Sequence, residues 1–194
     1  MSLDWVLIRG SGLVAYALLA GSTIWGLLIT TKVLGPAAKA KAITWFHEAL
    51  GIAGVLATVV HMVALSLHDY ISFTWAEILI PGRSDWNPTA TAFGVVAFYG
   101  SAIIAASFYV KRHIGQQAWR AIHFGSLGAF ASALIHGLTA GTDSQVPQVS
   151  AMYAATGTAV LLLVIIRVSQ EMAGPTRSRR TVERPSPAEP IRPS

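Results

Sequence analysis

The sequence predicts an all-α integral membrane protein, a bundle of five transmembrane helices with its N-terminus outside and its C-terminus in the cytoplasm. The first observation is composition: 53% of the 194 residues are hydrophobic and only 12% are charged, as in membrane proteins. The second is that five apolar runs are each long enough to cross a bilayer. The third is that Lys and Arg gather in alternate connections between these runs.

The predicted spans cover residues 11–31, 44–67, 91–110, 119–140 and 151–168. Between the second and third spans we expect a loop with a short interfacial helix around Ile71–Ile80, because its aromatic residues suit a headgroup boundary. Gly141–Gln148 is predicted to be a short polar turn. Residues 1–173 should form one transmembrane domain, and residues 174–194, rich in Pro, Arg, Ser and Glu, a disordered cytoplasmic tail.

The distribution of positive residues predicts the orientation. Twelve of the fourteen Lys and Arg residues follow the first, third and fifth spans, whereas only Arg9 and Arg83 belong to the other side. Cytoplasmic connections are enriched in Lys and Arg, so these spans end inside a multi-pass protein of the cell membrane. The formal net charge of +5 does not indicate a nucleic-acid partner, because the positive residues lie in loops and a tail beside apolar spans.

The chain contains no cysteine, which excludes disulfides, thiolate metal sites, iron–sulfur clusters and cysteine nucleophiles. Histidine is the remaining candidate for metal chemistry. His47 and His61 stand fourteen residues apart in the second span, and His123 and His136 stand thirteen apart in the fourth. A histidine within a membrane-length apolar run is costly and needs a partner, so all four are functional candidates.

The predicted orientation pairs these histidines by depth. The second and fourth spans both run from inside to outside, so His47 and His123 lie near the inner boundary and His61 and His136 near the outer one. We interpret the first two as the inner pair and the last two as the outer pair, each the axial ligands of one b-type haem. The helix rise predicts about 20 Å between the two irons.

The surface between the two histidines of the second span is made of small residues. Fourteen residues return to within about 40° of the starting direction, so Gly51, Gly54 and Thr58 share the face of His47 and His61. This face predicts a shallow groove that a flat ligand such as haem could enter. The alternative is that the small residues pack closely against a neighbouring helix.

The fourth span is less regular. Thirteen residues leave His136 about 140° around an ideal helix from His123. Either this helix is distorted, or its two histidines reach their ligands from different sides.

The histidine spacing, the stretch Trp119–His123, the pair His136-Gly137 and the parallel topology of the two spans resemble the ferric reductase-like transmembrane family. That family includes the haem domain of the NADPH oxidases and the haem subunit of the periplasmic methionine-sulfoxide reductase system. The resemblance covers roughly residues 9–168. It implies the same pairing, with the inner histidines on one haem and the outer ones on another.

The resemblance also implies a role and partners. Many family members continue into a cytoplasmic domain for FAD and NAD(P)H, but this chain shows no flavin or nicotinamide site. We therefore expect an oxidoreductase component that takes electrons from a separate flavoprotein or a membrane quinol. The acceptor would be external, a ferric chelate or a redox protein. Leu65 stands where superoxide-producing members have a further histidine, which argues against oxidase activity.

Two further residues are candidates for contacts with haem propionates. Arg120 precedes His123 by three residues and could pair bidentately with a carboxylate, or it could be an ordinary inside-loop charge. His68 continues the face of His61 and could contact the outer haem, or it could face water at the end of its span.

Two other function classes remain open from sequence. One is a haem-binding membrane subunit with a structural or sensing role. The other is a metal-ion transporter that uses the histidines as ligands. A transporter is expected to gather its ligands near the membrane midplane, whereas these histidines are predicted at two depths.

Overall fold

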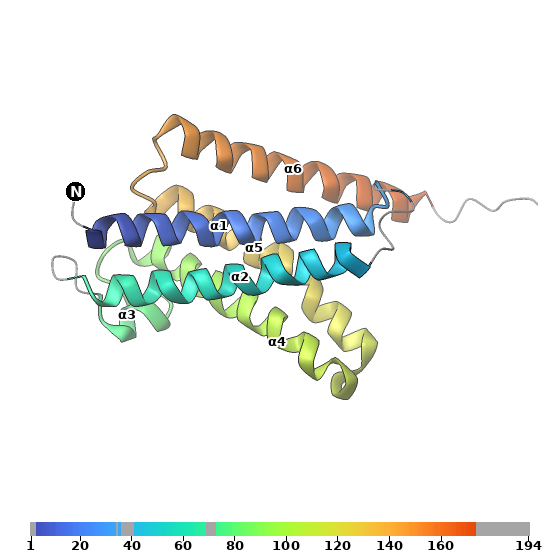
Figure 1. The fold of residues 1–194 in the computed structure, drawn as a ribbon, viewed down its shortest axis with the longest axis horizontal. Coiled ribbons are helices and arrows are strands. Elements are labelled where there is room, and N and C mark those ends of the chain that lie inside the picture. Colours follow the sequence, from blue (N-terminus) through green and yellow to red (C-terminus); the bar gives the residue numbers. More distant parts are fainter. Residues whose placement is uncertain (1–2, 34, 36–40, 69–72, 174–194) are drawn as a thin grey trace, which may run out of the picture.

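The computed structural model describes residues 3–33, 35, 41–68 and 73–173, which form six helices and no strand (Figure 1). The helices are α1 (Leu3–Thr30), α2 (Lys41–Ser66), α3 (Trp75–Leu79), α4 (Pro88–Phe124), α5 (Ser126–Ala140) and α6 (Pro147–Met172). The predicted all-helical class is confirmed for this part of the chain. The predicted tail, residues 174–194, lies outside the described residues.

Four helical stretches in the described part are long and apolar enough to cross a membrane. They are Trp5–Thr30, Lys41–Ser66, Pro88–Ala140 and Pro147–Met172. This pattern is consistent with a multi-pass membrane protein, in which helices satisfy every backbone hydrogen bond within the segment.

The helices extend beyond the predicted spans, and α6 runs from Pro147 to Met172 rather than from 151 to 168, so it includes the end of the predicted turn Gly141–Gln148. α1 begins at Leu3 rather than at residue 11, and α4 continues past residue 110 to Phe124. The prediction ended the spans at charged residues, but a charged side chain does not end a helix when it reaches a partner or water. Arg9, for example, lies within α1 and pairs with Asp143.

The stretch from Pro88 to Ala140 reverses its direction. A straight helix of 53 residues would be about 80 Å long, whereas a bilayer core is about 30 Å thick. The reversal occurs at Gly115, whose φ of 80° lies in the region that favours glycine. α5 then packs beside α4, where a Cβ on Gly100 would lie 3.2 Å from the Cβ of Ala129.

A second irregularity lies within the predicted fourth span. α4 ends at Phe124 and α5 begins at Ser126, with Gly125 between them. His123 and His136 therefore stand on separate helical segments, and the angle of an ideal helix does not relate them. Of the two alternatives left by the sequence, the distorted helix is the one that the structure contains.

α1 and α2 run antiparallel and side by side (Figure 1). Their contact is close because a Cβ on Gly54 would come within 2.8 Å of Leu19, and a Cβ on Gly51 within 3.3 Å of the Ser22 hydroxyl. These two glycines therefore pack against α1. The predicted groove between the histidines of α2 is wrong, and the close packing of small residues against a neighbouring helix is what the structure shows.

The hydrophobic core lies where α1, α5 and α6 meet. Its buried residues are Tyr16, Ala20, Leu27, Phe130, Tyr153, Val160 and Leu163. The rings of Tyr16 and Tyr153 meet edge to face with centroids 4.7 Å apart, and the Tyr16 hydroxyl lies 2.6 Å from that of Thr156. A buried phenol thus finds the polar partner that it needs.

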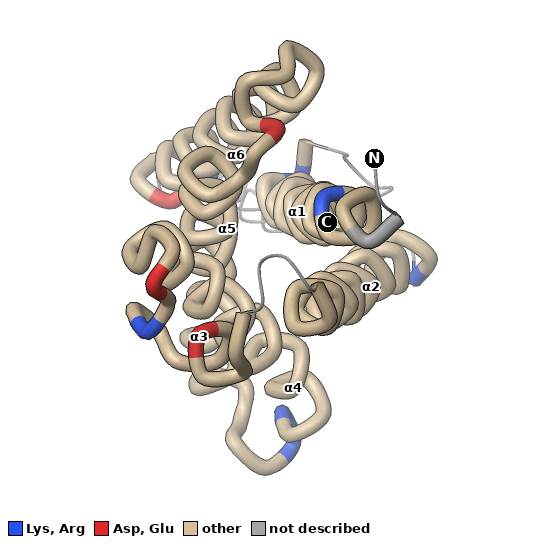
Figure 2. The backbone as a smooth tube through the Cα atoms, turned by 90° about the vertical axis from the view of Figure 1, so that its left-hand side faces the viewer, with Lys and Arg blue, Asp and Glu red and all other residues tan. Residues whose placement is uncertain are grey.

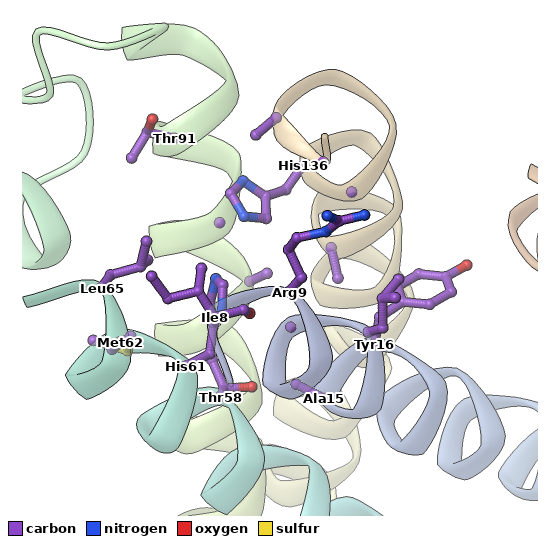
Figure 3. Close-up of a pocket in the computed structure, with 18 of the residues that line it drawn as sticks. Ile8, Arg9, Ala15, Tyr16, Thr58, His61, Met62, Leu65, Thr91 and His136 are labelled. Atoms are coloured by element: carbon purple, nitrogen blue, oxygen red, sulfur yellow. The ribbon is translucent and has the colours of Figure 1, made fainter. Parts of the chain in front are cut away.

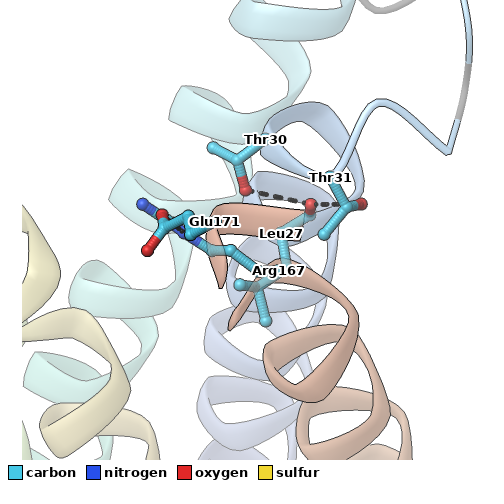
Figure 4. A network of polar contacts seen from close by, with 5 residues as sticks. All are labelled: Leu27, Thr30, Thr31, Arg167 and Glu171. Carbon is cyan, nitrogen blue, oxygen red and sulfur yellow. Dashed lines mark hydrogen bonds and ion pairs between the residues drawn. The ribbon is translucent and has the colours of Figure 1, made fainter. Parts of the chain in front are cut away.

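Hydrogen bonds at the C-terminal end of α1 link successive turns, and one from Gln170 joins this end to α6. Figure 4 shows the hydroxyls of Thr30 and Thr31 bonded to the carbonyl of Leu27, at 3.0 and 2.8 Å, beside Arg167 of α6. The side-chain amide of Gln170 donates to the carbonyl of Thr31 at 3.0 Å. The carbonyls of Leu27, in the last turn of α1, and of Thr31, just past it, are therefore satisfied within the protein.

α3 lies at the opposite end of the bundle, which Figure 2 views along the helices. It falls within the predicted interfacial segment, of which residues 71 and 72 lie outside the described residues. Thr74 and Glu77 form a reciprocal capping box at its start. Hydrogen bonds from the backbone and hydroxyl of Thr74, and from the backbone of Asp85, hold the pKa of Glu77 below its usual value.

Candidate functional site

The outer pair, His61 of α2 and His136 of α5, lines a cavity of about 230 Å³ between α1, α2, α4 and α5. In Figure 3 the ring of His136 points into this space from α5. Most of the lining is apolar, as is usual for sites that hold organic cofactors. The structure thus places the two histidines that the sequence pairs on opposite walls of one cavity.

His61 is fixed by a contact with α1. Its Nδ1 lies 2.9 Å from the carbonyl oxygen of Ile8. One turn further along α1, Gly12 leaves room for the ring, because a Cβ there would come within 3.0 Å of His61 Cε1. The imidazole of His61 therefore contacts α1 at two points, the carbonyl of Ile8 and Gly12, which are four residues apart.

His47 of the inner pair is held in the same way. Its Nδ1 lies 2.9 Å from the carbonyl oxygen of Ser22, and the Ser22 hydroxyl lies 3.2 Å from the same nitrogen. Gly26, four residues after Ser22, makes room for the ring, since a Cβ there would come within 2.9 Å of His47 Cε1.

His136 repeats the arrangement on a different pair of helices. Its Nδ1 lies 2.8 Å from the carbonyl oxygen of Ala90 in α4. Gly94 follows Ala90 by four residues, and a Cβ at this position would come within 2.8 Å of the His136 ring. The same spacing of carbonyl and glycine thus occurs three times, at three of the four predicted ligands.

These contacts determine the tautomer of each ring. A carbonyl oxygen can only accept, so Nδ1 carries the hydrogen in His47, His61 and His136. Nε2 is left with its lone pair, which is the form of histidine that binds a metal. Metal-ligating histidines usually donate their other ring N–H to a carbonyl or carboxylate, which fixes the direction of the ring.

His123 completes the inner pair. Its ring centroid lies 5.9 Å from that of His47, with an angle of 78° between the planes. Two imidazoles bound to one metal ion at about 2.0 Å each have centroids about 6 Å apart. His123 is held differently from the other three, by stacking on the indole of Trp119 at 5.0 Å. The structure thus brings together the two histidines that the sequence assigns to the inner boundary.

The chemistry of the donor set fits haem. Each pair offers two imidazoles, which are the groups that a protein supplies to a b-type haem with two histidine ligands. Haem brings its own four equatorial nitrogens and needs only axial ligands from the protein.

Sequence reasoning missed the ion pair between Arg9 and Asp143, both of which line the cavity. Arg9 also lies over the ring of Trp5, with its guanidinium carbon 5.9 Å from the ring centroid. The signal available in the sequence was that a cation and an anion border apolar spans on the same predicted side.

Arg120 and His68 are the two residues predicted to contact haem propionates. Arg120 is exposed, as a charge in an inside loop is expected to be. His68 is half-buried and meets the ring of Trp5 edge-on at 5.9 Å, so it is not simply a water-facing end of α2.

Comparison with protein-family models, with curated proteins and with solved structures found no match to this chain.

Proposed function

We propose that this chain is a bis-haem b-type cytochrome of the cell membrane. In this proposal it carries electrons from a cytoplasmic flavoprotein or a membrane quinol to an external acceptor, such as a ferric chelate or a periplasmic redox protein. We also propose that it belongs to the ferric reductase-like transmembrane family, on the residues quoted for that resemblance.

The observation that carries this proposal is the repeated fixing of Nδ1. His47, His61 and His136 each donate to a backbone carbonyl of a neighbouring helix, with a glycine making room for the ring. A histidine that served packing alone would not need the same tautomer and the same glycine spacing three times. Ligation through Nε2 needs that tautomer and a ring fixed in one direction, and the glycines let each ring reach its carbonyl.

The residues of the chain would perform two tasks in this function. The imidazoles hold the cofactor at two levels of the bundle, His47 and His123 at one and His61 and His136 at the other. The largely apolar lining of the cavity would lower the dielectric around the outer site. Haem, when bound, supplies a one-electron iron couple whose potential depends on the axial ligands and the surrounding dielectric.

The topology in this proposal has five crossings, because the stretch from Pro88 to Ala140 passes through the membrane twice. The N-terminus is outside and the C-terminus inside. Six of the eight Lys and Arg residues in the described part belong to the end that we assign to the cytoplasm. They are Lys32, Lys41, Lys111, Arg112, Arg120 and Arg167.

A haem count tests the proposal. The purified protein should give about two haems per chain in a pyridine haemochrome assay, with low-spin b-type bands that sharpen when dithionite is added. A ratio near one would contradict the two-site proposal. A protein with no haem at all would exclude the function.

A further inference from the structure

The indole N–H of Trp119 is a hydrogen-bond donor beside the inner pair. Its indole is nearly parallel to the ring of His123, with centroids 5.0 Å apart and planes inclined by 21°. Its Nε1 is buried and has no hydrogen-bond partner among the described residues. A buried N–H without an acceptor is costly, so such a group in a folded protein calls for a partner that the polypeptide itself does not supply.

A positive charge lies over the same ring. The Nζ of Lys111 stands 3.9 Å from the centroid of the Trp119 indole. Lys111 precedes the reversal at Gly115 and Trp119 follows it, so the turn brings the two together. Neither ion pair found among the described residues involves Lys111.

An indole N–H and an ammonium group are both donors that cannot accept. The group that completes them must therefore offer acceptor atoms, and an anionic acceptor makes the strongest hydrogen bonds to these donors. Trp119 stacks on His123, which places this pair of donors beside the inner histidines.

We propose that Trp119 and Lys111 form a subsite for a carboxylate of the cofactor bound at the inner pair, to which the indole N–H and the ammonium group both donate. The inference rests on the proposed function, in which this carboxylate is a propionate of the inner haem. It assigns to Trp119 a positioning role that goes beyond the stacking of His123.

The test uses variants that remove the hydrogen-bond donors and keep the size of the side chains similar. Trp119→Phe removes the N–H and keeps an aromatic ring on His123, and Lys111→Met removes the charge and keeps most of the side-chain length. Trp45→Phe and Arg112→Met are matched controls, since Trp45 is 67% exposed and Arg112 is an exposed neighbour of Lys111. Each full-length variant is purified with its haem. Low-spin spectra first verify that both histidines of the inner pair remain ligands.

Two readouts apply to these variants. The rate of haem transfer to excess apomyoglobin should rise about tenfold for the inner haem in Trp119→Phe and in Lys111→Met, and not for the outer haem. In a redox titration the inner midpoint potential should fall in both variants. Lys111→Met removes a positive charge that disfavours the oxidised iron, and Trp119→Phe removes a donor that partly offsets the negative charge of the carboxylate. The control variants should match the wild type.

Reconstitution with haem dimethyl ester identifies the interacting group. The ester has no anionic carboxylate, so wild type and Lys111→Met should then lose the inner haem at equal rates. If both Trp119→Phe and Lys111→Met retain the wild-type loss rate and potential in a protein with two haems, the subsite is contradicted while the proposed function stands. A wild-type protein without haem would instead contradict the proposed function, and this inference with it.

Discussion

Gly12 of α1 lies directly against the imidazole of His61, so close that a Cβ at this position would come within 3.0 Å of the ring. The glycine lets the ring approach α1 and reach the carbonyl of Ile8, at 2.9 Å from Nδ1. A residue that contributes no side chain thus determines the direction of a predicted ligand.

The first prediction follows from this contact. Gly12→Val should push the His61 ring off the carbonyl of Ile8 and remove most of the outer haem, with an overpacking cost of about 1–3 kcal/mol. Gly10→Val is the matched control, because a Cβ on Gly10 of the same helix would have nothing within 4 Å. The haem content of the two purified variants should differ by about one haem per chain. Equal content would show that the glycine does not position the ligand.

The second prediction concerns the pairing of the ligands. His47→Ala or His123→Ala should remove mainly the inner haem, and His61→Ala or His136→Ala mainly the outer one. The measurement is the reduced-minus-oxidised spectrum together with the haem count. His113→Ala is the control, because His113 is exposed. Loss of the same haem from His47→Ala and His61→Ala would contradict the assignment of these histidines to two sites.

The sequence predicted the helices and the pairing of the inner histidines, but not the glycine contacts that hold the rings. Hydropathy predicted the apolar helices because a membrane span needs length and composition, both of which can be read along the chain. The depth argument paired His47 with His123, and the structure places their rings 5.9 Å apart. The reversal at Gly115 was anticipated only as a loop, since no sequence rule indicates that helical residues continue to both sides of it.

The sequence did not predict which helix each histidine ring contacts. Glycine is common in membrane helices, so Gly12 and Gly26 carried no signal of their own. They are fourteen residues apart, as are His61 and His47 in α2. This match identifies the contacts only once the register of two antiparallel helices is known. Register is a tertiary property, which explains why local patterns did not reveal it.

The third prediction uses the absence of cysteine from the chain. Asp85→Cys introduces an exposed thiol near α3, and Gln116→Cys an exposed thiol at the reversal of α4. A membrane-impermeant maleimide added to intact cells should label the first variant and label the second only after permeabilisation. Neither substitution changes a Lys or Arg, so the signal for orientation is preserved. Labelling of Gln116→Cys in intact cells would reverse the inner and outer assignment of every histidine.

The fourth prediction concerns the ion pair at the cavity. Arg9→Gln and Asp143→Asn should each lower the free energy of unfolding by about 1–3 kcal/mol, because each leaves a partly buried polar group without its partner. The double variant should lose less than the sum of the two. Thermal melting of the four proteins in detergent provides the double-mutant cycle. Additive losses would show that Arg9 and Asp143 do not stabilise one another.

Electron transfer across a sealed bilayer tests the central claim most directly. Liposomes containing the purified protein enclose ferricyanide, and dithionite is added outside with a protonophore to release the membrane potential. We predict that the enclosed ferricyanide is reduced, that protein-free liposomes and those with His47→Ala or His61→Ala keep it oxidised, and that NADPH alone does not replace dithionite. If the wild-type protein binds two haems and both become reduced while the enclosed ferricyanide remains oxidised, the chain does not carry electrons across the membrane.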